Sequence, residues 1–369
     1  MGHLILEGDG FIYKGFILAG ETSLAMSLID SGTGGFGLDF LVLNGTTSVS
    51  IGSAAGGALA GGYNVLHQLA EANNVLTAVT ISGFFTNSSE LFILGSPSGN
   101  SNTGDGVVTA TAEAIMSTKI ASSLTLIDAS ATTGRVDILA GATNTSGGGN
   151  FENGGSLNAN VSITYTGLTI KGGSGLDFIE NDAKNGIVTD GNSNDDIVIL
   201  GGAGAKAVLG TGTSDRVFVG VSDLGTNEAP GNALGDKVTF GSAATAELLV
   251  RTGAEAGSTA GTASIGLTKV VNAADGMEID FTPVTGSHFI ADETTVVASA
   301  TTLKAAENAA VNAFGGSGVA YFSFHGNEYF IATANVETVV SSHDAIVELV
   351  GITDIHHAAN NFGLVTLHV

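Results

Sequence analysis

The sequence predicts a mainly β protein: a parallel β-roll or β-solenoid flanked by β-rich regions and a few short helices. Glycine occupies 55 of the 369 positions, about twice its usual share. Short apolar runs alternate with clusters of Gly, Asn, Ser, Thr and Asp, which is typical of short strands joined by turns. A glycine-aspartate nonapeptide also recurs along the chain, and recurrence at a fixed period indicates stacked coils.

The apolar runs give the expected strands, at residues 40–43, 91–94, 124–127, 197–200 and 217–219. Three segments have the apolar spacing of helices instead, at residues 65–79, 110–120 and 301–314. By pattern the chain divides into an N-terminal β-rich, solenoid-like region (1–165), a repeat region (166–240) and a C-terminal β region with one helix (241–369).

The repeat fits the pattern GGxGxDxUx, in which U is a large aliphatic residue. Two copies, 172–180 and 34–42, match every specified position, and three imperfect copies begin at Gly191, Gly210 and Gly231. The sixth-position aspartates of the central group recur at intervals near twice nine residues, so one coil should comprise two strands and two glycine-rich turns. These aspartates are Asp177, Asp196, Asp215 and Asp236.

The common spacing predicts that all four aspartates lie on one side of the roll, with the turn at Lys206 on the other side. The eighth position is aliphatic in each copy and is expected to point into the narrow interior. It carries Ile179, Val198, Val217 and Val238 in the central copies, and Val208 in the half-period segment 201–209 between two of them. Glycine is expected where the backbone needs positive φ.

Stacked turns of this composition offer carboxylate and carbonyl oxygens, which hard divalent cations prefer. Calcium fits such a site better than magnesium, which keeps its waters. The candidate ligand turns contain Gly172, Gly173, Gly175, Asp177, Gly191, Asn192, Asn194, Asp195, Asp196, Gly210, Gly212, Asp215, Gly231 and Asp236, and in the first copy Gly34, Gly35, Gly37 and Asp39. A glycine-rich turn that binds no ion is the alternative, most of all at Asp39.

Charge and composition narrow the function classes. The net charge of −24 favours cations and excludes nucleic acid as the expected partner. Cysteine is absent, so neither disulfides nor thiolate metal sites are available. No stretch reaches about 18 uninterrupted apolar residues, so no transmembrane segment is expected. The first residues lack the pattern of a cleavable secretory signal.

The repeat region resembles the repeats-in-toxin (RTX) family, and the order of segments near the C-terminus resembles that of type I secreted surface-layer proteins. The segments near the C-terminus are, in order, an Ala-rich helix, the glycine turn 315–318, the aromatic run 321–331 and the apolar segment 344–354. The resemblance implies a calcium-loaded parallel β-roll and type I secretion by an uncleaved C-terminal signal. It covers the repeats and roughly the last 70 residues.

No catalytic constellation accompanies the repeats: the sequence contains neither HExxH nor GxSxG. His356 and His357 near Asp354 could bind a metal, but adjacent strand residues face opposite ways, so surface histidines are favoured. The expected protein is therefore not an enzyme but a self-assembling surface-layer or cell-surface filament subunit. It would fold outside the cell on binding calcium, with copies of itself and possible cell-surface polysaccharide as partners. The alternative is a type I secreted adhesin, or an RTX-type exoenzyme or toxin fragment with a noncatalytic repeat tail.

Overall fold

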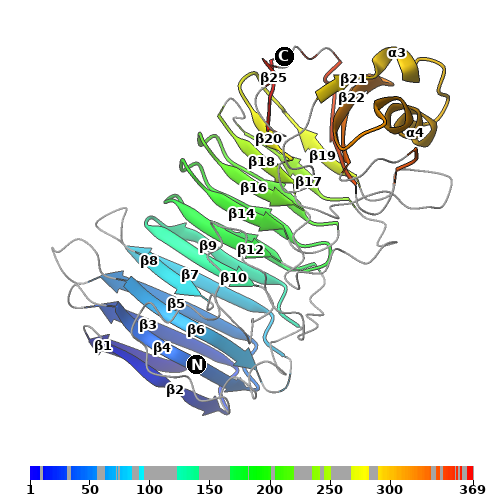
Figure 1. Ribbon diagram of the computed structural model, residues 1–369. Coiled ribbons are helices and arrows are strands. Elements are labelled where there is room, and N and C mark those ends of the chain that lie inside the picture. Colours follow the sequence, from blue (N-terminus) through cyan, green and yellow to red (C-terminus); the bar gives the residue numbers. More distant parts are fainter. Residues whose placement is uncertain are drawn as a thin grey trace. The chain divides into compact units, whose positions relative to one another are not determined.

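The computed structural model describes most of the chain and divides it into two compact units (Figure 1). Residues 1–193 and 223–225 form the first unit, and residues 194–222 and 226–369 form the second. The described residues are 1–8, 11–30, 35–55, 63–71, 73, 75–84, 91–94, 123–140, 167–181, 183–200, 204–219, 235–241, 245–250, 267–281, 290–333, 338–340, 344–353, 355, 358–359 and 364–368.

The first unit consists of two sheets whose strands are all parallel, and the chain alternates between them, one strand at a time. In sheet A the strand order is β1-β3-β5-β7-β9-β11-β13, and in sheet B it is β2-β4-β6-β8-β10-β12. The strands are β1 (Gly2–Gly8), β2 (Phe11–Ala19), β3 (Ser23–Asp30), β4 (Gly35–Asn44), β5 (Ser48–Ala55), β6 (Tyr63–Glu71), β7 (Ala78–Phe84), β8 (Leu91–Leu94), β9 (Leu126–Thr132), β10 (Arg135–Ala140), β11 (Thr169–Lys171), β12 (Asp177–Asn181) and β13 (Ile187–Thr189).

Aliphatic ladders hold these coils together, because parallel in-register pairing repeats each inward side chain one strand further on. In sheet A, Leu24 pairs with Val49, which pairs with Val79, and the ladder continues through Ile127 and Ile170. All five are at most 3% exposed. The coils are thus joined by continuous backbone pairing around a dry interior, which is the architecture of a β-solenoid.

The second unit contains parallel coils followed by an antiparallel segment. In this unit the order is β15-β17-β19-β24-β23-β22-β21 in sheet A and β14-β16-β18-β20-β26-β25 in sheet B. The strands are β14 (Ile197–Leu200), β15 (Lys206–Val208), β16 (Arg216–Val219), β17 (Lys237–Thr239), β18 (Glu247–Val250), β19 (Thr268–Val271), β20 (Glu278–Asp280), β21 (Ile290–Asp292), β22 (Gly318–Phe324), β23 (Asn327–Thr333), β24 (Ala345–Leu349), β25 (Ala358–Ala359) and β26 (Leu364–Thr366).

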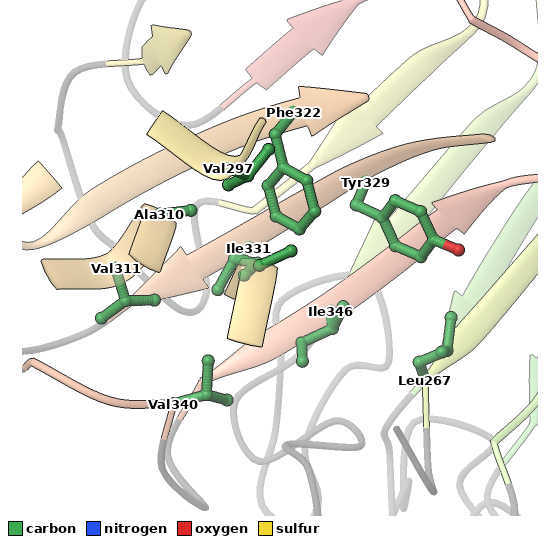
Figure 2. Packing of buried hydrophobic residues seen from close by; sticks show 10 residues of the cluster. Leu267, Val297, Ala310, Val311, Phe322, Tyr329, Ile331, Val340 and Ile346 are labelled. Atoms are coloured by element: carbon green, nitrogen blue, oxygen red, sulfur yellow. The ribbon is translucent and has the colours of Figure 1, made fainter. Parts of the chain in front are cut away.

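Two helices, α3 (Thr294–Val297) and α4 (Leu303–Phe314), pack on the antiparallel strands β22 and β23. Thr302 caps α4 by accepting a hydrogen bond from the Ala305 amide, and Gly315 ends it in the left-handed conformation. Figure 2 shows the core between them, where the rings of Phe322 and Tyr329 stack at 5.4 Å beside Ile331. No helix among the described residues is long and apolar enough to cross a membrane.

The mainly β, parallel-coil architecture is confirmed, and α4 confirms the helix expected at 301–314. The helix expected at 65–79 is wrong, because β6 pairs in parallel with β4 and β8 there. Apolar residues three apart do not distinguish a helix from a strand whose two faces are both covered, and Val65 and Leu66 are both fully buried. The helix expected at 110–120 lies outside the described residues.

Candidate metal centre

The turn before β12 brings the backbone close to a buried carboxylate. Asp177, the first residue of β12, is fully buried, and its Oδ2 accepts a hydrogen bond of 2.6 Å from the amide of Gly173. A Cβ atom on Gly172 would lie 2.5 Å from Oδ2 of Asp177 and 2.5 Å from Oδ1 of Asp190. The two carboxylates therefore converge on the space that the missing side chain of Gly172 leaves.

Close approach, rather than positive φ, is the reason for glycine in this turn. Neither Gly172 nor Gly173 has positive φ, which corrects the expectation from the sequence. A Cβ on Gly173 would collide with the hydroxyl of Thr132, and one on Gly191 would collide with the carbonyl oxygen of Gly173. Left-handed backbone occurs instead at the fifth position of two imperfect copies, at Asp195 (φ 66°) and Ser214 (φ 65°).

Three aspartates form a group that can hold a metal ion. One carboxylate oxygen from each of Asp177, Asp190 and Asp196 lies within 4.8 Å of the other two. Asp177 and Asp196 are buried and Asp190 is half-buried. Asp190 and Asp196 are the two ends of one short connection between β13 and β14. Oxygen is the only donor atom in this group, which suits a hard cation.

Asp190 was not among the predicted ligands. It follows β13 directly and stands just before Gly191, outside the nonapeptide, so the repeat pattern assigns it no role. Its Oδ1 accepts a hydrogen bond of 2.9 Å from the Gly191 amide. The available signal was its position at the end of a strand, beside a glycine that permits close packing of neighbouring turns.

The next copy along the chain places Asp215 beside Asp196. The Asp196 amide donates a hydrogen bond of 3.3 Å to Oδ1 of Asp215, and Asp215 is only 1% exposed. Burial, and then the negative charges of Asp196 and Asp195, raise the pKa of Asp215 to about 6. The Asp215 carboxylate therefore takes up a proton at a higher pH than an ordinary aspartate. A nearby cation would favour its charged form.

The exposed residues of these turns make hydrogen bonds between successive turns of the second unit. Oδ1 of Asn194 accepts a hydrogen bond from the Thr213 amide, and the Asp195 amide donates to the Thr213 carbonyl. Asn192 is exposed, whereas Gly212 is buried. Gly210 lies against Gly241, where a Cβ would collide with the Gly210 carbonyl oxygen.

Asp236 does not share a row with Asp196 and Asp215. It precedes β17, which pairs with β15 in sheet A, whereas β14 and β16 lie in sheet B. Its Oδ1 accepts a hydrogen bond of 2.9 Å from the Ala205 amide, beside the Lys206 strand that was expected on the opposite side. The prediction of a single row is wrong, because the connection from Val219 to Lys237 is longer than those that join the strands from β11 to β16. The interval of 21 residues between Asp215 and Asp236 therefore spans half a coil, from the start of β16 to the start of β17, and not a full coil.

The prediction that Val208 points into the interior is also wrong. Val208 is 44% exposed, and Ala207, fully buried, fills the interior at that level. Ile179, Val198, Val217 and Val238 are all fully buried, as predicted. The shift by one residue in β15 reverses every side chain of that strand, since strand side chains alternate between faces.

The first repeat copy does not form a turn like the one at Gly172. Strand β4 begins at Gly35, so Gly35, Gly37 and Asp39 lie within a strand of sheet B. A Cβ on Gly37 would collide with the backbone of Val65 in the neighbouring strand. Glycine therefore serves strand packing here. Gly34 and Gly231 lie outside the described residues.

No protein-family model matches the chain, and no curated protein matches it at a significant level.

Proposed function

We propose that the protein is a structural subunit that folds on binding calcium outside the cell and assembles with copies of itself into a surface layer or filament. The observation that carries the proposal is the group of three carboxylates at Asp177, Asp190 and Asp196, held where parallel coils turn. An ion at this point would join strands that the sequence separates, and would therefore contribute to folding itself.

Calcium suits this group for two reasons. The donors are carboxylates within turns that also present backbone carbonyls, and calcium takes six to eight oxygen ligands at about 2.3 to 2.6 Å in flexible geometry. The space at Gly172 is bordered by the carboxylates of Asp177 and Asp190. Backbone amides hold both in place, that of Gly173 for Asp177 and that of Gly191 for Asp190. Magnesium demands near-octahedral geometry and retains several waters, which a buried turn accommodates less well.

Electrostatics supports an extracellular role. With a net charge of −24, the protein carries repulsion that bound divalent cations reduce. Extracellular calcium modules of low rigidity bind at about 10⁻⁴ to 10⁻³ M. Such a site is filled at the calcium concentration outside cells and empty at that of cytosol, so folding would follow export.

We propose a structural role rather than an enzymatic one because the buried residues of the described fold form the coils and the contacts between them. The buried carboxylates Asp177, Asp196 and Asp215 lie in the turns of the coil. Aliphatic ladders fill the interior between the sheets. In each unit the parallel strands of sheets A and B repeat the same outward positions from coil to coil, and repeated faces are suited to repeated contacts.

The test is calcium titration of the full chain by calorimetry, with electron microscopy of the same samples. Asp177→Asn keeps an oxygen that can accept the Gly173 hydrogen bond but removes the charge, so we expect calcium affinity to fall at least about tenfold. Asp275→Asn is the matched control, because the side chain of Asp275 is 70% exposed and, among the described residues, forms an ion pair with His368 only. Calcium binding and ordered assembly that are both insensitive to Asp177→Asn and to chelator would refute the proposal.

A further inference from the structure

Three lysines form a row on the outer face of sheet A in the second unit. Lys206 pairs with Lys237, and Lys237 pairs with Lys269, in successive parallel strands β15, β17 and β19. All three are exposed, while the residues that follow them, Ala207, Val238 and Val270, are fully buried. The row holds three of the 11 basic residues in the whole chain.

Within the described residues, this row is largely uncompensated. Lys269 forms an ion pair of 2.9 Å with Glu348 of β24, the next strand of the sheet. No carboxylate of the described residues forms an ion pair with Lys206 or Lys237. Neighbouring strands lie about 4.8 Å apart, and like charges directly opposite one another on neighbouring strands are destabilising. The arrangement therefore favours an anionic surface as a binding partner.

Sheet B of the same unit carries an acidic row at the same levels of the coil. Glu247 of β18 pairs with Glu278 of β20, and Arg216 of β16 precedes them. Burial and the charge of Asp280 raise the pKa of Glu247, while Arg216 opposes the shift and Glu278 adds to it. Glu247 and Glu278 are thus half-buried neighbouring charges of equal sign, with Arg216 beside Glu247 only, and a row of opposite sign would stabilise the pair.

We propose that the lysine row of sheet A binds the acidic row of sheet B on a second copy of the chain. The two rows are opposite in sign and equal in spacing: Lys206 and Lys237 lie on neighbouring parallel strands of sheet A, and Glu247 and Glu278 lie on neighbouring parallel strands of sheet B. A flexible anionic polymer could neutralise the lysines, but it would leave the acidic row unmatched. A second copy satisfies both rows at once.

The contact is heterologous, since each copy uses one face as a donor of positive charge and the other face as its acceptor. Such a contact leaves a free lysine row on one copy and a free acidic row on the other, so association continues to an open assembly unless the rotation closes a ring. The inference rests on the proposed structural function and adds to it the residues and the direction of the contact.

Charge reversal on each face tests the inference. We expect K206E/K237E and E247K/E278K each to weaken self-association of the full chain at least about tenfold in sedimentation velocity with calcium present. The lysines chosen form no ion pair within the described part of the chain, so the fold is least disturbed. K206R/K237R keeps the charge and is expected to assemble like the unmodified protein. Circular dichroism and calcium titration establish that each variant is folded and binds calcium.

Mixing is the decisive experiment. In an equimolar mixture, the reversed sheet A of K206E/K237E faces the reversed sheet B of E247K/E278K, and the unmodified faces also match in sign. We therefore expect the mixture to recover assembly that neither variant shows alone, as should a single chain carrying all four reversals. Failure of the mixture to recover assembly would overturn the inference.

The outcomes separate the inference from the proposed function. Unmodified protein that assembles with calcium, together with reversals that assemble equally well, overturns the charge-row contact and leaves the calcium-dependent structural role standing. Unmodified protein that binds calcium but stays monomeric overturns both self-assembly and the contact. Binding of an acidic polysaccharide that K206E/K237E alone abolishes, without self-association, identifies a different occupant and also overturns the contact.

Discussion

The backbone amide of Asp196 donates a hydrogen bond of 3.3 Å to Oδ1 of Asp215, and the two residues stand directly before the paired strands β14 and β16 of sheet B. Two carboxylates are thereby held at successive levels of the coil, both almost fully buried. Holding two buried carboxylates this close lowers the stability of the fold when both are charged. This cost makes the stability of the protein depend on pH and on cations, and the dependence can be measured.

The pH dependence has a definite sign. Because the pKa of Asp215 is raised from 3.8 to about 6, the folded protein binds more protons than the unfolded chain between these values. We expect the free energy of unfolding, measured by denaturant in the presence of chelator, to fall as pH rises from about 4 to 6. The loss attributable to this group is at most about 3 kcal/mol.

Asp215→Asn provides the control for this pH effect, since the amide oxygen can still accept the Asp196 hydrogen bond. The slope between pH 4 and 6 should become flatter in this variant. Excess calcium should also oppose the loss, because the ion favours the charged carboxylates. An unchanged slope in Asp215→Asn would assign the pH dependence to other groups.

Gly172→Ala should weaken cation binding. The new Cβ would lie 2.5 Å from oxygens of both Asp177 and Asp190, so the carboxylates must move apart. We expect calcium affinity to fall at least about tenfold, which is typical when the groups that position metal ligands are disturbed. Luminescence of bound terbium, which occupies oxygen sites of this size, is a suitable measurement.

Gly52→Ala is the matched control for Gly172→Ala. Gly52 lies in β5, and its nearest neighbours would be 3.6 Å and 3.7 Å from an added Cβ, which is ordinary contact. This substitution should leave terbium binding unchanged. Equal behaviour of the two alanine variants would contradict the placement of the ion beside Gly172.

Two valines of similar sequence context should differ in their contribution to stability. Val217 is fully buried in β16, whereas Val208 of β15 is 44% exposed. Val217→Ala should lower the free energy of unfolding by roughly 1 to 3 kcal/mol, from lost burial and a residual cavity. Val208→Ala should stay within about 0.5 kcal/mol of the unmodified protein. Comparable losses in urea unfolding would show that the β15 register is incorrect.

The sequence predicted the coil best where the coil length is constant. Asp177, Asp196 and Asp215 recur every 19 residues, and a strand of sheet B begins at Asp177 and directly after each of the other two. In the N-terminal part, Gly2 pairs with Leu24, Ser23 with Ser48, and Ser48 with Ala78, so successive coils contain 22, 25 and 30 residues. No fixed period exists there for a pattern search to detect, although the pairing is equally regular.

The carboxylate group was only partly predictable for a related reason. A nonapeptide pattern ranks residues by their place within the repeat, so it found Asp177 and Asp196 but not Asp190, which precedes Gly191. It also treated Asp236 as another member of the row, since linear spacing does not distinguish a full coil from a half-coil with a longer connection. Which turns face one another is decided by strand pairing in three dimensions.

The long connection between Val219 and Lys237 has a practical consequence. Strand β16 still pairs in register with β18, and β15 with β17, despite the added residues. The length of this connection therefore does not determine the register in which the flanking strands pair. A foreign peptide inserted between Val219 and Lys237 should therefore leave both strand pairings unchanged, which makes this connection a candidate site for carrying a guest sequence.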